Sequence, residues 1–231
     1  VGAPLELEET RVHLNLQRLV ERSVGVFGKS GTGKSFLTRL LMAGVIRSGI
    51  GVSLIFDMHN DYGWEVTAEG GYKVKGLKQL FGDRVSILTL DAESSRRRGA
   101  RYDFEVRLSY KEIEPEDIAM LKVTLNLSDT MVDAAYTLAK RWGAEWVERL
   151  LAGRADDLEE IAENTNILGG TLAALQRRIE RFNRWDFLTK ESTGESVNQI
   201  IDLLVNQRKS VVLEFGRYGN TVEAYMLVAN Y

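Results

Sequence analysis

The feature that most constrains this chain is a glycine-rich loop at residues 28–35. It reads Gly28-Lys29-Ser30-Gly31-Thr32-Gly33-Lys34-Ser35 and meets the pattern Gly-x4-Gly-Lys-Ser in full. In such a loop glycines let the backbone bend so that successive N–H groups face a phosphate, and the following helix adds its positive N-terminal end. The loop requires a strand before it and a helix after it, and the apolar run 24–27 predicts that strand.

The loop residues predict a binding site for a nucleoside triphosphate. Lys34 is expected to reach the β- and γ-phosphates, and the hydroxyl of Ser35 is expected to bind the Mg²⁺ that bridges them. The predicted nucleotide-binding residues are Gly28, Lys29, Ser30, Gly31, Thr32, Gly33, Lys34, Ser35 and Phe36. A glycine-rich turn that binds nothing is the alternative, and the sequence on both sides of the loop disfavours it.

Length and composition limit the remaining possibilities. The 231 residues suit one domain, or one domain with a substantial insertion. The absence of cysteine excludes disulfides and cysteine nucleophiles, and two histidines are too few for a histidine metal cluster. A net charge of −3 argues against a surface that coats nucleic acid, although it allows a local basic channel. Without a signal peptide or an apolar run of about 18 residues, we expect a cytoplasmic protein with no membrane segment.

Strand and helix patterns alternate along the chain. Strands are expected at 11–16, 52–56, 85–90, 103–108 and 210–216, a helix from the loop to Gly49, and a loop with a short helix at 70–83. The succession of strand, phosphate-binding loop, helix and strand predicts an α/β fold of the P-loop NTPase class with a mainly parallel sheet.

Between residues 110 and 205 the pattern becomes helical, which predicts a helical insertion within a domain that spans residues 1–231. Pro115 fits the first turn of a helix, Ser128 is a suitable N-cap, and Thr171 is expected to open a further helix. Three tryptophans are expected in the core of this region: Trp142, Trp146 and Trp185.

A second informative stretch, Asp57-Met58-His59-Asn60-Asp61-Tyr62-Gly63, follows the strand predicted at 52–56. Ligands of open α/β sheets bind at the carboxyl ends of the strands, so Asp57 or Asp61 could hold Mg²⁺ or orient the attacking water. Asp, Asn and Gly are also common turn formers, so a capped turn is an equal alternative.

The glycine-rich loop and this second stretch resemble the HerA branch of the HerA–FtsK motor ATPases. That branch typically shows Gly-x-Thr-Gly-Ser-Gly-Lys-Ser and then Asp-Pro-His-Gly-Glu-Tyr. The segments 12–16 and 19–22 also fit, with weaker agreement at 175–180 and 210–216. The chain departs from the pattern at Ser30, Thr32, Met58, Asn60 and Asp61. The resemblance implies a RecA/FtsK-like fold, ATP and Mg²⁺ as ligands, and a hexamer that threads double-stranded DNA, often beside a nuclease partner.

The resemblance also implies an acidic pair, Asp followed by Glu, on a further strand. Three apolar runs end in an acid, at Asp57, Asp91 and Glu214, and none is followed by a second carboxylate. In the family the strand with the pair follows the helix that comes after the strand resembling 210–216. We therefore expect the pair and the arginine finger beyond Tyr231, with the ATPase domain incomplete at its C-terminus.

Basic residues give a weaker signal for DNA. Arg177, Arg181 and Arg184 are spaced to share one helix face, which could line a DNA channel, meet a neighbouring subunit's nucleotide, or simply face solvent. The arginines of a predicted loop, 96–98 with Arg101, could contact phosphates or lie in a flexible surface loop.

Three functions remain open from the sequence. The first is an ATP-hydrolysing, HerA-like DNA translocase or helicase for DNA end processing or defence, with Lys34, Asp57 and Asp61 as catalytic residues and Ser35 and Asp57 as metal ligands. The second is a conjugation or type IV secretion ATPase. The third is a nucleotide-binding regulatory module without turnover.

Overall fold

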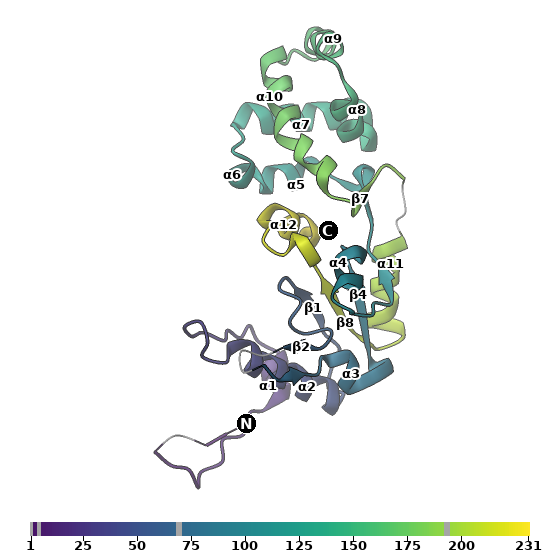
Figure 1. The fold of residues 1–231 in the computed structure, drawn as a ribbon. Coiled ribbons are helices and arrows are strands. Elements are labelled where there is room, and N and C mark those ends of the chain that lie inside the picture. Colours follow the sequence, from purple (N-terminus) through teal and green to yellow (C-terminus); the bar gives the residue numbers. More distant parts are fainter. Residues whose placement is uncertain (1, 4–5, 68–70, 192–194) are drawn as a thin grey trace.

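A parallel sheet lies at the centre of the structure, a computed structural model that describes residues 2–3, 6–67, 71–191 and 195–231 (Figure 1). Its strands, in spatial order, are β1 (Leu54–Asp57), β8 (Ser210–Glu214), β4 (Val85–Thr89) and β5 (Phe104–Glu105). Every pair of neighbours runs parallel. The predicted mainly parallel α/β fold is therefore confirmed. Because β8 lies between β1 and β4, the carboxyl ends of all three strands meet at one edge of the sheet.

Helix α2 (Lys34–Ser48) starts within the glycine-rich loop, and Gly49 is its C-cap, in agreement with the predicted helix. Gly49 adopts a left-handed conformation with φ of 69°, which glycine allows without strain. A small core joins α2 to α3 (Leu77–Phe81) and to the sheet; its buried members are Ile46, Leu77, Val85 and Val212. This packing fixes the C-terminal half of α2 beside the sheet.

Helices fill most of the chain between β6 (Leu108–Ser109) and β8, and those from α5 to α10 form the upper part of Figure 1. They are α5 (Pro115–Met120), α6 (Lys122–Leu125), α7 (Asp129–Trp142), α8 (Trp146–Ala152), α9 (Ala155–Thr165), α10 (Gly169–Ile179) and α11 (Glu195–Ile201). Pro115 occupies the first turn of α5, and the Ser128 side chain accepts a hydrogen bond from the N–H of Met131 to cap α7, as predicted. The helix expected to open at Thr171 begins two residues earlier.

One hydrophobic core connects these helices to the sheet. It includes Leu138 and Phe182 from the helices, Leu88 and Leu213 from the strands, and Leu227 from α12 (Val222–Asn230). Trp146 and Trp185 are buried in it, and Trp142 packs against it while partly exposed. The expectation that these tryptophans contribute to the core is therefore confirmed.

Two predicted strands near the N-terminus are wrong. In the described part of the chain, residues 11–16 contain only an isolated bridge between Gly2 and Val12, and α1 (Leu16–Val20) begins at the last residue of the expected strand. The Asn15 side chain accepts a hydrogen bond from the N–H of Arg18, so a helix cap overrides the alternating pattern.

The apolar run 24–27 is also not a strand. No described residue pairs with it, and Phe27 is 93% exposed. A strand needs neighbouring strands to satisfy its hydrogen bonds, so an apolar run alone does not form one. The predicted basic loop is wrong as well, because residues 92–97 form helix α4 (Ala92–Arg97).

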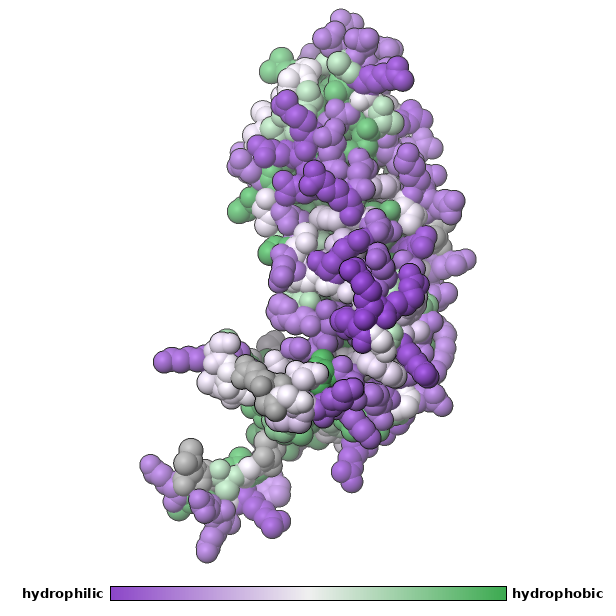
Figure 2. Space-filling model, in the orientation of Figure 1, coloured by the Kyte–Doolittle hydropathy of each residue, from purple (hydrophilic) through white to green (hydrophobic). Residues whose placement is uncertain are grey.

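Polar side chains cover most of the face shown in Figure 2, and the N-terminal arm projects away from the body. Helices of the described ranges are all too short or too polar to cross a membrane.

Candidate functional site

The glycine-rich loop bends at two left-handed glycines immediately before helix α2. Gly31 and Gly33 have φ of 77° and 84°, values that L side chains rarely adopt, and Gly33 is the N-cap of α2. At Gly28 a side chain would place its Cβ 2.6 Å from the Thr32 hydroxyl oxygen, so a larger residue would have to displace the Thr32 side chain. The loop therefore leads directly into the positive end of a 15-residue helix.

Lys34 is held inside this loop. Its ammonium donates a hydrogen bond to the carbonyl oxygen of Lys29 at 2.6 Å, and the Thr32 hydroxyl donates to the same oxygen at 2.7 Å. Because both donors bind the same carbonyl oxygen, the loop curves around the Lys34 ammonium. A phosphate oxygen would offer Lys34 a negatively charged acceptor in place of a neutral carbonyl, so the attraction between opposite charges would add to the hydrogen bond.

An open hollow of about 730 Å³ lies in front of the loop. Its lining residues are Ser30, Gly31, Gly33, Lys34, Ser35, Phe36, Arg39, Asp61, Val66, Thr67, Tyr72 and Val74. The volume falls in the range of about 300 to 1,000 Å³ that is typical of small-molecule sites. Left-handed glycines, a lysine and the N-terminus of a long helix in one hollow fit a nucleotide's phosphates, and the Ser35 hydroxyl supplies the type of ligand that Mg²⁺ accepts.

Asp57 organises the stretch that follows β1. Its carboxylate is fully buried and accepts hydrogen bonds from the N–H groups of Asp61 at 2.8 Å, Tyr62 at 2.8 Å and Gly63 at 3.2 Å. Burial raises the pKa of Asp57, and these three donors oppose the rise. Both carboxylate oxygens thus have backbone partners, which is the geometry of a capped turn.

Asp61 and Tyr62 face the glycine-rich loop from this turn. Asp61 lines the hollow, and the buried guanidinium of Arg39 from α2 donates to its carbonyl oxygen. The Asp61 carboxylate has no hydrogen bond or ion pair with any other described residue. Burial raises the pKa of the Tyr62 hydroxyl, and hydrogen bonding to Thr38 and Ser35 opposes the rise.

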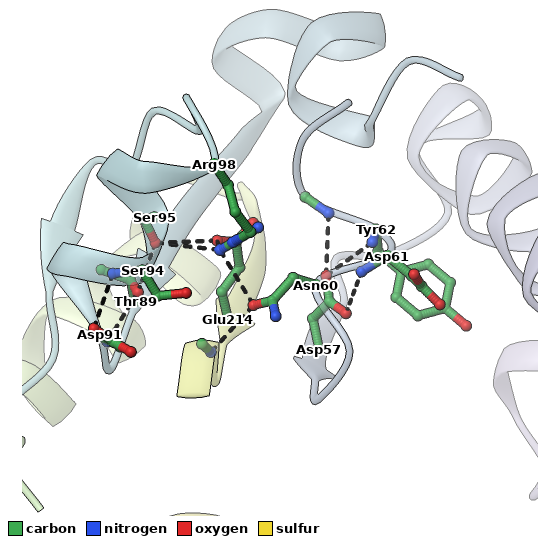
Figure 3. Close-up of polar contacts among 12 residues, drawn as sticks. Asp57, Asn60, Asp61, Tyr62, Thr89, Asp91, Ser94, Ser95, Arg98 and Glu214 are labelled. Atoms are coloured by element: carbon green, nitrogen blue, oxygen red, sulfur yellow. Dashed lines mark hydrogen bonds and ion pairs between the residues drawn. The ribbon is translucent and has the colours of Figure 1, made fainter. Parts of the chain in front are cut away.

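An ion pair between a buried glutamate and a partly exposed arginine lies beside this turn at the same edge of the sheet (Figure 3). The Glu214 carboxylate, at the end of β8, is fully buried and accepts a hydrogen bond from the guanidinium of Arg98 at 2.6 Å. Arg98 also contacts the Asn60 side-chain oxygen at 3.3 Å, and that oxygen accepts from the N–H of Gly216 at 3.1 Å. Burial raises the pKa of Glu214, Arg98 opposes the rise, and the charge of Asp57 adds to it. The second oxygen of Glu214 has no partner in the described ranges.

The third acid at a strand end, Asp91, serves the helix that follows it. Its carboxylate accepts a hydrogen bond from the N–H of Ser94 at 3.0 Å, which caps α4, and another from the N–H of Arg217 at 3.1 Å. Of the three acids expected at this edge, Asp57 binds only backbone groups among the described residues, Asp91 binds backbone groups and also pairs with the Arg217 guanidinium at 3.6 Å, and Glu214 pairs with Arg98.

The arginines predicted to share a helix face do lie together. Arg177 belongs to α10, while Arg181 and Arg184 belong to the short 3-10 helix Glu180–Arg184 that continues it. All three line a hollow of about 580 Å³ with Glu180, Asn183, Trp185, Thr221 and Glu223. Arg181 pairs with Glu223 at 2.8 Å, whereas Arg177 and Arg184 make no hydrogen bond or ion pair with the described residues.

Two parts of the site were not predicted from the sequence. One is the hairpin of β2 (Val66–Thr67) and β3 (Lys73–Val74), which contributes a wall of the hollow at the loop. The other is the pairing of Arg98 with Glu214, which joins residues 116 positions apart. Strands of two residues carry almost no periodicity, and a long-range ion pair has no local signal at all.

Comparison with known proteins assigns the chain to a family. The family described as the central domain of the helicase HerA matches residues 1–231. A protein from Pyrococcus furiosus described as a DNA double-strand break repair helicase HerA is 22% identical over 228 residues. That alignment covers 93% of this chain and 40% of the Pyrococcus protein, so the chain spans well under half the length of that relative. No solved structure matches.

Proposed function

This chain belongs to the family of the HerA helicase central domain, and we propose on that basis that it forms the ATP-binding part of a motor that moves along double-stranded DNA. The observation that carries the proposal is the loop of residues 28–35, whose left-handed glycines, lysine and helix N-terminus converge on one hollow. The Pyrococcus relative, described as a DNA repair helicase, supports DNA as the polymer along which the motor moves.

In the proposed reaction, water attacks the γ-phosphorus of ATP, the bond to the β-phosphate oxygen breaks, and ADP and phosphate leave. Lys34 and the loop N–H groups hold the phosphates, and Ser35 is the protein ligand of Mg²⁺, which neutralises charge on the phosphates when bound. We assign the water-orienting role to Asp61, because its carboxylate lines the hollow without a partner among described residues. Asp57 holds the turn that presents Asp61, since its own oxygens bind backbone N–H groups.

We expect duplex DNA to stimulate ATP hydrolysis by the full-length protein, because a translocase couples turnover to its track. The measurement is phosphate release with and without duplex DNA, together with the mass of the assembly in the same sample, for which we propose a hexamer in the cytoplasm. Equal rates with and without DNA would contradict the translocase. ATP binding without any hydrolysis would instead indicate a regulatory nucleotide-binding module, and hydrolysis stimulated only by a secretion partner would indicate a conjugation-type ATPase.

We further propose that Arg177 and Arg184 contact DNA phosphates. Both guanidinium groups are without partners in the described ranges, so no ion pair must break before they bind an anion. The double substitution Arg177→Ala with Arg184→Ala is expected to weaken duplex binding and to reduce the salt dependence of log K by about two, since each phosphate contact contributes about 0.9. Binding measured at several salt concentrations tests this.

The matched control is Arg141→Ala with Arg149→Ala, which removes the same charge from α7 and α8, where both arginines have partners in the protein. If the Arg177 and Arg184 variant binds DNA normally but loses ATP hydrolysis only in the assembled protein, the hollow instead faces a neighbouring subunit's nucleotide. A nuclease partner, which is also part of the proposal, is testable by co-purification.

A further inference from the structure

The hollow at the phosphate-binding loop has a second wall that the loop does not supply. The antiparallel pairing of β2 with β3 brings Val66, Thr67, Tyr72 and Val74 to this hollow. One part of the lining is therefore polar and built to hold phosphates, while another part carries aliphatic and aromatic side chains. A ligand that satisfies both parts has an anionic end and a flat, weakly polar end, as a nucleoside triphosphate does.

The hairpin packs against the turn that follows β1 at the point where the chain enters β2 and leaves β3. A side chain at Gly76 would place its Cβ 2.4 Å from the carbonyl oxygen of Gly63 and 2.5 Å from the backbone of Trp64, so the two ends of the hairpin touch backbone to backbone. The N–H of Leu77 donates to the carbonyl oxygen of Tyr62 at 2.8 Å. Because Arg39 of α2 binds the same turn, the hairpin is anchored to the helix that carries Lys34.

Two aromatic rings are exposed at this hollow. Tyr72 is 65% exposed and Phe36 is 59% exposed, and Tyr72 makes no hydrogen bond or ion pair within the described residues. Removing aromatic surface from water is favourable. A nucleotide base can cover such a surface, because aromatic rings stack on any base. The hairpin is thus the part of this hollow suited to the nucleoside rather than to the phosphates.

We propose that Tyr72 stacks on the base of the bound nucleotide, with Phe36 as a second apolar contact. This inference rests on the proposed ATP site and adds a base subsite to it. Stacking uses the π-face that every base has, so Tyr72 contributes affinity without selecting one base over another. Discrimination between ATP and GTP is therefore not expected to depend on this residue.

Calorimetric titration of the full-length protein with ATP, GTP and inorganic tripolyphosphate, each with Mg²⁺, tests the subsite. Tyr72→Ala is expected to weaken ATP and GTP binding equally, each by about tenfold, because one stacking contact is lost. Tripolyphosphate has no base, so its affinity is expected to stay unchanged. Tyr72→Phe keeps the ring and is expected to bind all three probes as the original protein does. The control is Tyr136→Ala, which removes a 42% exposed tyrosine from α7.

Unchanged ATP affinity in Tyr72→Ala would overturn the base subsite, and so would an equal loss of tripolyphosphate affinity, which would place the effect on the phosphates. Failure of the unsubstituted protein to bind either ATP or tripolyphosphate would overturn the proposed ATP site together with the subsite. Normal binding in all these assays without ATP hydrolysis would contradict the proposed motor and leave the base subsite standing.

Discussion

Replacing Lys34 by alanine is expected to abolish ATP hydrolysis by the full-length protein. The Lys34 ammonium lies within the loop, bound to the Lys29 carbonyl oxygen at 2.6 Å, at the start of α2. In the proposed reaction its positive charge would stabilise the negative charge that develops as the γ-phosphate leaves. Removing a single donor of this kind typically costs about 100-fold to 1,000-fold in turnover. Phosphate release at saturating ATP measures the loss.

The fold itself is expected to tolerate this substitution. Lys34 is only partly buried and its ammonium has one protein partner, so the melting temperature should change by no more than about 2 °C. Lys140→Ala is the matched control, because Lys140 is an exposed lysine on α7, outside the hollow. If Lys34→Ala hydrolyses ATP as fast as Lys140→Ala does, the assignment of the catalytic site is wrong.

Local signals in the sequence were enough to place the centre of the fold. The glycine-rich loop, helix α2 and strands β1, β4 and β8 all stand within one or two residues of the predicted positions. Each depends on residues close together in the chain: glycines at fixed spacing, apolar residues at helical spacing, or a short apolar run. The order of the strands in space follows from long-range pairing, and the sequence does not encode it locally.

The wrong predictions came from local sequence patterns that are compatible with two different structures. The basic stretch after β4 was predicted to be a loop because of its charge, yet Asp91 stands at the N-cap position and starts helix α4. Within that stretch Arg98 turns toward buried Glu214 while Arg97 stays 67% exposed, and nothing in a run of arginines distinguishes the two. At Asp57 the sequence left a catalytic acid and a capped turn equally open, and the backbone contacts show the turn.

Substituting Arg98 by alanine is expected to destabilise the fold far more than substituting its neighbour Arg97. Glu214 is fully buried, and one of its oxygens has Arg98 at 2.6 Å as its charged partner. Breaking a buried ion pair typically costs about 3 to 5 kcal/mol, and because Arg98 is one-third exposed we expect about 2 to 3 kcal/mol at pH 7.5. The melting temperature should fall by roughly 5 to 10 °C.

The loss of stability in Arg98→Ala is expected to be smaller at low pH. Burial raises the pKa of Glu214 above its value in the unfolded chain. The protonated carboxyl group therefore contributes stability that is full below the unfolded pKa and is lost as the pH rises through the folded pKa. Removing Arg98 takes away a group that lowers this pKa, so the carboxylate becomes harder to ionise. The deficit of Arg98→Ala should therefore shrink as the pH falls from 7.5 to 5, where the carboxyl group takes up a proton.

Denaturant unfolding of four proteins at these two pH values separates the ion pair from other causes. Arg97→Ala removes a neighbouring arginine whose partner Glu93 is exposed, so it should cost no more than about 0.5 kcal/mol at either pH. Arg98→Ala with Glu214→Gln should recover much of the stability, because a neutral amide replaces the unpaired buried charge. A loss in Arg98→Ala that is the same at both pH values, or that Glu214→Gln does not relieve, would show that Arg98 acts through packing and not through its charge.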